Sequence, residues 1–326
     1  MLKPRLVLLF LLIFSSDVFA NNADPIQLFD DGELEQAQQK FEERLQQDSN
    51  DSTALLYLAR IAQQNGDLDK AEELIEEALE KAPENAAIQY RYGGILGEVA
   101  GEASIFTALG YAKKSLKGLE RAAEIEPDNI EYQRGLLNYY LIAPGIAGGD
   151  NEQALKQAKS IQLLDEKAGV LAFSSVYRSM GDEDKLAQLF DSAIRQFPED
   201  ADLYQERGLS NQIQEKFSAA FADFHQAKVL AEKQPEAELE KYDAIYQLAR
   251  TSVLSEQRVL KGIEAMLIFI EQAPEIQELP SKEWASFRLA NLYELNEQKK
   301  EAKSIYRKLY KTTKDSDLKK RVKRKR

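Results

Sequence analysis

The glycine-rich stretch LIAPGIAGGD, residues 141–150, is the segment whose composition comes nearest to that of a catalytic loop. Glycine-rich loops bind phosphate in nucleotide-dependent enzymes, where backbone N–H groups at the start of a helix point at the ligand. Such a loop follows a strand and precedes a Lys-Ser or Lys-Thr pair. Here Asp150-Asn151-Glu152 follows instead, and its carboxylates would repel phosphate. We interpret the stretch as an enlarged turn that is a secondary candidate for partner contact.

Nucleophilic and metal chemistry have few candidate residues. His225 is the one histidine and the chain has no cysteine, so a zinc site would lack nitrogen and sulfur ligands. His225 follows the core-type Phe224 on a predicted helix, and we expect it to face solvent. No Gly-x-Ser-x-Gly nucleophile elbow occurs. We therefore predict no catalytic residue, no metal and no cofactor.

Carboxylates are abundant, as in the run Glu72, Glu73, Glu76 and Glu77. Their i, i+4 spacing is typical of the solvated side of a helix. Two carboxylates that meet across a groove are the arrangement of a glycoside hydrolase, so a carboxylate-dependent hydrolase is the least favoured alternative. The main prediction is that the protein is not an enzyme.

The composition favours an ordered, helix-rich chain. Hydrophobic residues make up 44% of the 326 residues and charged residues 30%, with only 16 Gly and 9 Pro. The fold class predicted is all-α. A formal net charge of −12 argues against nucleic acid as a partner of the body of the chain.

The N-terminus has the features of a secretory signal peptide over residues 1–20. Lys3 and Arg5 precede the apolar run 6–14, and Ala20 supplies a small residue at a cleavage point. The run is well short of the roughly 20 apolar residues that span a bilayer. The absence of cysteine fits export into an oxidising compartment. We expect a periplasmic or secreted protein from a Gram-negative bacterium.

The sequence repeats itself. GELEQAQQKFEERLQQDSND (32–51) aligns with GDLDKAEELIEEALEKAPEN (66–85) at a step of 34 residues, and the same step separates Phe190 from Phe224. The general pattern is Gly-Asp, then Ala, then an aromatic residue four positions later, then Ala three positions further on, and a proline that closes the unit. This pattern resembles the tetratricopeptide repeat.

The resemblance implies a right-handed α-solenoid of about eight stacked helical hairpins over residues 21–315, because such hairpins bury their apolar sides only by stacking. Insertions are expected near 95–114, as a lengthened or extra helix, and at 143–149, as the enlarged turn. Residues 316–326 form a basic C-terminal tail.

In this family the first helices of the hairpins line a concave surface that binds partners, and the resemblance assigns one set of residues to that surface. These are Tyr90, Arg134, Asn138, Arg178, Gln205, Tyr246, Arg250 and Trp284. Aromatic, arginine and amide side chains are typical of binding hot spots, although each could instead contact a neighbouring helix.

The family's carboxylate clamp, which grips the C-terminal acid of a peptide, is matched only at its start, by Arg134 and Asn138. Ala172 stands where the pattern needs Asn, and Asp202 and Glu206 replace the basic pair. We therefore do not expect recognition of chaperone tails. The general peptide-groove mode stays open.

The C-terminal run KKRVKRKR (319–326) has three interpretations: a solubilising end that suits the helix dipole, a contact for anionic lipid or envelope polymer, or an arm on the acidic body. The function predicted is an exported scaffold or adaptor that binds a protein or peptide partner in envelope assembly or regulation. The alternative is a scaffold for polysaccharide or peptidoglycan machinery.

Overall fold

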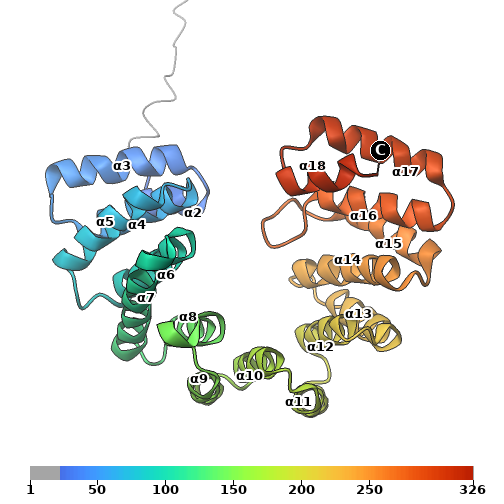
Figure 1. Cartoon of the computed structure of the whole chain (residues 1–326), viewed down its shortest axis with the longest axis horizontal. Coiled ribbons are helices and arrows are strands. Elements are labelled where there is room, and N and C mark those ends of the chain that lie inside the picture. The colour runs from blue at the N-terminus through green and yellow to red at the C-terminus, as the bar shows by residue number, and fades with distance from the viewer. Residues whose placement is uncertain (1–22, 326) are drawn as a thin grey trace, which may run out of the picture. The chain divides into compact units, whose positions relative to one another are not determined.

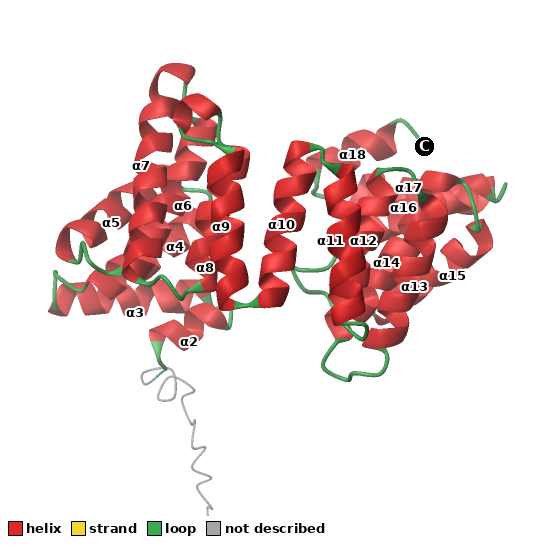
Figure 2. Cartoon of the chain, turned by 90° about the horizontal axis from the view of Figure 1, so that it is seen from below, coloured by secondary structure: helices red, strands yellow, loops and turns green. Residues whose placement is uncertain are grey.

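The computed structural model describes residues 23–325, so the predicted signal peptide lies outside the described residues. Every regular element of the described part is helical, and consecutive helices pair as antiparallel hairpins, which makes the protein an all-α solenoid of the predicted class (Figures 1 and 2). The contacts divide the chain into two units that meet between Ala172 and Phe173. Each unit is described by itself.

The N-terminal unit contains the first hairpins. Its helices are α2 (Pro25–Asp30), α3 (Leu34–Gln47), α4 (Ser52–Gln64), α5 (Leu68–Lys81), α6 (Ala86–Glu102), α7 (Ile105–Ile125), α8 (Ile130–Ile142), the 3-10 turn η1 (Gly145–Ala147), α9 (Asn151–Leu164) and the start of α10 (Glu166–Met180). Asp or Asn at the N-cap accepts a backbone N–H at most of these helix starts, as Asp51 does from Ala54. The hairpin turn at Gly66 has a φ of +77°, which glycine adopts without strain.

The insertion near 95–114 lengthens a hairpin and adds no separate element. The helices α6 and α7 have 17 and 21 residues. They approach closely at small residues, since a Cβ on Gly93 would lie 2.7 Å from Leu119 Cγ and one on Gly118 would lie 2.8 Å from the carbonyl oxygen of Gln89. The Ser115 hydroxyl donates to the carbonyl oxygen of Gly93 at 2.6 Å.

The segment 143–149 is a turn between α8 and α9. Gly148 has a φ of +105°, and the side chain of Asp150 caps α9. The hydroxyl of Tyr139 lies 2.8 Å from the carbonyl oxygen of Ala147 and 2.7 Å from that of Ala112 on α7. The turn is therefore held against the neighbouring hairpin.

The C-terminal unit continues the series. Its helices are the end of α10, then α11 (Glu183–Gln196), α12 (Ala201–Ile213), α13 (Phe217–Ala231), α14 (Glu238–Ser255), α15 (Val259–Gln272), α16 (Lys282–Leu295), α17 (Lys299–Thr312) and α18 (Ser316–Lys323). The first helices α12, α14 and α16 contact one another in succession, while α13, α15 and α17 are the second helices of their hairpins (Figure 1).

The basic C-terminal segment contains the short helix α18. Leu318 and Val322 are buried in a cluster with Phe287 and Tyr306 of the last hairpin. The lysines and arginines of α18 are exposed. The helix therefore covers the apolar end of the unit with one side and presents a basic surface with the other. Among residues 23–325 no helix combines the length and the hydropathy that crossing a bilayer requires.

Candidate partner-binding face

The predicted surface residues of the N-terminal unit divide into one structural residue and two exposed ones. Tyr90 is half-buried, with its ring centroid 4.8 Å from that of Tyr132, and it fills the space above Gly135. Arg134 and Asn138 are exposed on α8. Both side chains of the exposed pair are accessible to a partner.

In the C-terminal unit two predicted contacts have structural roles. Tyr246 is 6% exposed and its ring lies 5.2 Å from that of Phe269, so it is a core residue and not the surface contact predicted from the sequence. The indole of Trp284 donates to Asp315 at 2.8 Å, and the guanidinium of Arg321 lies 5.6 Å from its ring centroid. Trp284 therefore links the C-terminal segment to α16 through these two contacts.

The remaining predicted residues are polar and lie on first helices. Arg178, on α10, forms an ion pair with Glu206 at 3.2 Å. Gln205 and Arg250 belong to a hydrogen-bonded network between α12 and α14 that we call the polar seam. The seam comprises Gln205, Gln212, Asp243, Gln247, Arg250 and Thr251.

The hydrogen bonds of the polar seam begin at Asp243. Its carboxylate accepts from Gln205 Nε2 at 2.5 Å and from Gln247 Nε2 at 3.2 Å. Farther along, Gln212 Nε2 donates to Thr251 Oγ1 at 2.7 Å. Arg250 Nη1 donates to the side-chain oxygens of Gln212 at 2.5 Å and Gln247 at 3.2 Å. The network joins two consecutive first helices.

The register of α12 and α14 produces this network. The pairs Gln205 with Asp243 and Gln212 with Arg250 are both separated by 38 residues, so the two helices lie in one constant register along the seam. Gln212 and Thr251 are buried, whereas Arg250 and Asp243 are partly exposed. The seam is thus a buried polar layer with charged groups at its surface.

The unpaired buried polar atoms lie on the first helices of the C-terminal unit, one of them in the polar seam itself. Within residues 23–325 the buried side-chain nitrogen and oxygen atoms without a hydrogen-bond partner are Gln205 Oε1, Glu240 Oε2 and Arg288 Nε. They lie on α12, α14 and α16, which are the three successive first helices. Burying a polar atom without a partner costs about 1–3 kcal/mol, so these positions are candidates for contact with a ligand.

The charges of the seam are incompletely compensated. Burial lowers the pKa of the Arg250 guanidinium, and the like charge of Arg288 lowers it further. The described part of the chain places no carboxylate within ion-pair distance of Arg250 or Arg288. Burial raises the pKa of Asp243, and the charge of Glu206 adds to this effect. The carboxylate of Asp243 acts on Arg250 only from beyond ion-pair distance, so the two arginines have no direct ion pair.

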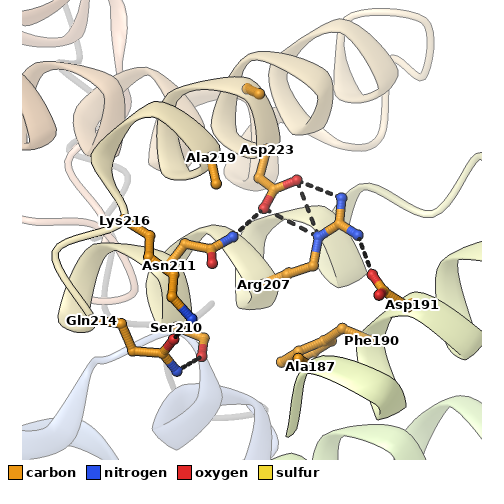
Figure 3. A pocket seen from close by; sticks show the side chains of 11 residues that line it. Ala187, Phe190, Asp191, Arg207, Ser210, Asn211, Gln214, Lys216, Ala219 and Asp223 are labelled. Atoms are coloured by element: carbon orange, nitrogen blue, oxygen red, sulfur yellow. Dashed lines mark hydrogen bonds and ion pairs between the residues drawn. The ribbon is translucent and has the colours of Figure 1, made fainter. Parts of the chain in front are cut away.

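A pocket of about 320 Å³ between α11, α12 and α13 provides a contrast (Figure 3). Arg207 donates to both carboxylate oxygens of Asp223 and to Asp191, and Asn211 donates to Asp223 at 2.8 Å. The charged groups of this network already satisfy one another. We infer that it holds three helices together and leaves little for a ligand.

The sequence did not reveal Gln212, Asp243, Gln247 or Thr251 as members of the seam, nor Arg288 as a neighbour of Arg250. Their signal is the 38-residue spacing of polar residues. It exceeds the 34-residue period because α13 and the connection 232–237 are longer than their counterparts α5 and 82–85. Across the described residues, no group of three or more His, Asp or Glu side chains is arranged to hold a metal ion.

Comparisons with known proteins agree with the architecture. The tetratricopeptide repeat family matches at residues 28–93 and again at residues 284–313. A search of curated proteins found no match. Yeast Tom70 is similar in structure, with a TM-score of 0.68 and 17% identity over 90% of this chain, which spans 58% of the Tom70 chain. A human IFIT1 dimer with PPP-AAAA has a TM-score of 0.50 and 20% identity, covering 91% of this chain and 70% of that one.

These identities are low, so the two structures support the fold alone. The family matches cover the first hairpins and the last one, where the repeat is also most regular in the sequence. The matched segments, residues 28–93 and 284–313, are similar to tetratricopeptide repeats, and the paired helices between them continue the same architecture.

Proposed function

We propose that this protein is an exported scaffold that binds a protein partner through the first helices of its C-terminal unit. Tetratricopeptide repeats are a protein-binding fold, and repeat arrays of this kind offer extended surfaces to a partner. The observation that carries the proposal is the pair Arg250 and Arg288, two guanidinium groups that repel each other beside the polar seam, with no carboxylate within ion-pair distance of either.

The physical argument concerns uncompensated charge. Burial of the Arg250 guanidinium and repulsion from Arg288 are both unfavourable, and both lower the pKa of Arg250. An anionic group of a partner, such as an Asp or Glu side chain, would offset that cost and accept charge-assisted hydrogen bonds. Because Arg250 is held by two glutamine oxygens, little side-chain freedom would be lost on binding.

Export is part of the proposal and is supported by the sequence. Lys3 and Arg5, the apolar run 6–14 and Ala20 have the order of a cleavable signal peptide. We propose a periplasmic location and a role in envelope assembly or regulation. N-terminal sequencing of the protein from fractionated cells should find Asn21 as the first residue. A cytoplasmic protein that still begins at Met1 would end this part of the proposal.

The basic side of α18 supports a second, weaker candidate function. Its exposed lysines and arginines could contact an anionic envelope polymer or lipid, as a scaffold for polysaccharide or peptidoglycan machinery would need. This contact would be electrostatic, since Leu318 and Val322 are already buried. Deletion of 319–326 should then abolish a salt-dependent association with anionic vesicles or purified polymer.

The test of the main proposal is a partner measurement with paired variants. Crosslinking in the envelope would identify partners of the wild type, and the affinity of the purified partner would then be measured. We expect the Arg250→Gln, Arg288→Gln double variant to bind at least about tenfold more weakly, because a charge-assisted hydrogen bond contributes about 1.5–3 kcal/mol. The matched control is Arg307→Gln with Lys308→Gln, two exposed cations of α17. Equal losses in both variants would refute the proposal.

A further inference from the structure

The polar seam has a second end whose character is opposite to that of the arginine pair. This acceptor end consists of Gln205, Glu240 and Asp243. Gln205 is 9% exposed, and its side-chain oxygen has no hydrogen-bond partner. Glu240, one helical turn before Asp243 on α14, also has a buried oxygen without a partner. Here acceptors are in excess, whereas donors are in excess at Arg250 and Arg288.

We propose that the acceptor end is a subsite for a cationic group of the partner, a Lys or Arg side chain, so that the seam binds a peptide segment carrying a basic and an acidic residue at a fixed spacing. This inference rests on the proposed function of the seam. An ammonium group has three donors and no acceptor, which matches the side-chain oxygens of Gln205, Glu240 and Asp243.

No cation of the described chain lies within ion-pair distance of Glu240 or Asp243, and Arg250 acts on Asp243 only from a longer distance. Arg178 forms its ion pair with Glu206, and Arg250 donates to the oxygens of Gln212 and Gln247. The carboxylate of Asp243 accepts from two neutral amides, Gln205 and Gln247. The negative charge of Glu206 acts unfavourably on Asp243, and a bound cation would offset that repulsion.

The helix fixes the spacing of the two subsites. Asp243 and Arg250 are seven residues apart on α14, which corresponds to about 10 Å at a rise of about 1.5 Å per residue. An extended peptide covers the same length in about three residues at about 3.3 Å each. The segment expected is therefore Lys-x-x-Glu or its equivalent with Arg or Asp, with the basic residue over the start of α14.

The experiment uses fluorescein-labelled peptides of nine residues with blocked ends, built on Ala, Ser and Gly. The first peptide has Lys and Glu three positions apart, the second replaces Lys with norleucine, and the third places Lys and Glu side by side. Fluorescence anisotropy measures their affinity for the full chain. The first peptide should bind about tenfold more tightly than the second, as expected for one charge-assisted contact. It should also bind more tightly than the third.

Variants assign that advantage to the acceptor end. In Glu240→Gln with Asp243→Asn the ratio of affinities between the first two peptides should fall to near one. The control Glu301→Gln with Glu297→Gln, two exposed carboxylates at α17, should keep the tenfold ratio. A thermal melt of each variant establishes that it is folded. A ratio near one in the wild type, or an unchanged ratio in the Glu240/Asp243 variant, would overturn the cation subsite.

The same peptides separate this inference from the proposed function. If the first two peptides bind the wild type equally and both weaken in Arg250→Gln with Arg288→Gln, the partner face stands and the cation subsite fails. If neither peptide binds, or if neither responds to the arginine substitutions, the proposed function of the seam fails as well.

Discussion

The first helices of the two units belong to the same kind of repeat, but different types of side chain join them to one another. In the N-terminal unit, the rings of Tyr90 on α6 and Tyr132 on α8 contact each other at a tilt, and Tyr90 lies against Gly135. In the C-terminal unit, amides, a carboxylate and arginines link α12 and α14. Among the described residues, the buried polar atoms that lack a partner all belong to the second face.

The difference separates a face whose groups all have contacts within the unit from a face that has unpaired polar atoms. Aromatic rings and small residues fill the N-terminal face with contacts that need no further partner. A polar layer has a stability cost unless every donor and acceptor is paired, and three atoms of the C-terminal face are not paired. We interpret the unpaired atoms as groups that contact the partner.

The largest expected effect concerns the close contact beneath the N-terminal face. Gly118→Ala should lower the free energy of unfolding by about 2–3 kcal/mol, since its Cβ would lie 2.8 Å from the carbonyl oxygen of Gln89 and 3.0 Å from the nitrogen of Gly93. Gly110→Ala on the same helix meets nothing within 4 Å and should stabilise the protein by up to about 1 kcal/mol. Denaturant unfolding measures both. Two changes of the same sign would contradict the contact.

The next effect tests the polar seam. Gln212→Ala should cost about 1–3 kcal/mol, because Arg250 loses an acceptor and Thr251 loses a donor in a buried place. Gln214→Ala, two residues later and at the end of α12, serves as the control, with an expected change within about 0.5 kcal/mol. Similar values for the two variants would mean that the seam contributes no stability.

A smaller effect depends on pH. Because burial raises the pKa of Asp243 in the folded protein above the ordinary aspartate value of 3.8, the folded state holds the proton more tightly than the unfolded state. Stability from this group is therefore present below pH 3.8 and is lost as the pH rises through the folded pKa.

Asp243→Asn should remove that loss, so the stability difference between variant and wild type should shift in favour of the variant as the pH rises above 3.8. Urea titrations between pH 3 and pH 8 would measure it, with Asp191→Asn as the control. A difference that is constant with pH would show that Asp243 is not perturbed.

The smallest effect is expected at the surface. Arg178→Gln breaks the ion pair with Glu206 at 3.2 Å, both side chains being about one-third exposed. Exposed pairs contribute about 0–1 kcal/mol, so the melting temperature should change by less than the Gln212 substitution changes it. A larger change would indicate that Arg178 belongs to the seam.

The sequence was sufficient for the fold because the period is carried by residues whose environment is set locally. Ala37, Phe41, Ala71 and Ile75 recur at 34 residues and all are fully buried. The turn at Gly66 and the cap at Asp67 likewise depend only on their neighbours along the chain. Local rules of this kind can be recognised in a single sequence.

The candidate site was predicted only in part, because side-chain direction depends on packing between repeats. Gln205 and Arg250 lie at the seam as members of the expected surface, but Tyr246 points into the core and Trp284 into the contact with the C-terminal segment. Arg288 carries no local signal, since an arginine on a helix is ordinarily exposed. Its unpaired nitrogen is evident only when α14 and α16 are in place.

The most direct test compares the two faces by photo-crosslinking in the cell. A photoreactive amino acid replaces Leu254, which is exposed one turn after Arg250 on α14, or Asn138, which is exposed on α8 of the other unit. We predict that the same partner is crosslinked efficiently from position 254 and not from position 138. Crosslinking from 138 alone, or equally from both positions, would contradict the assignment of the binding face to the C-terminal unit.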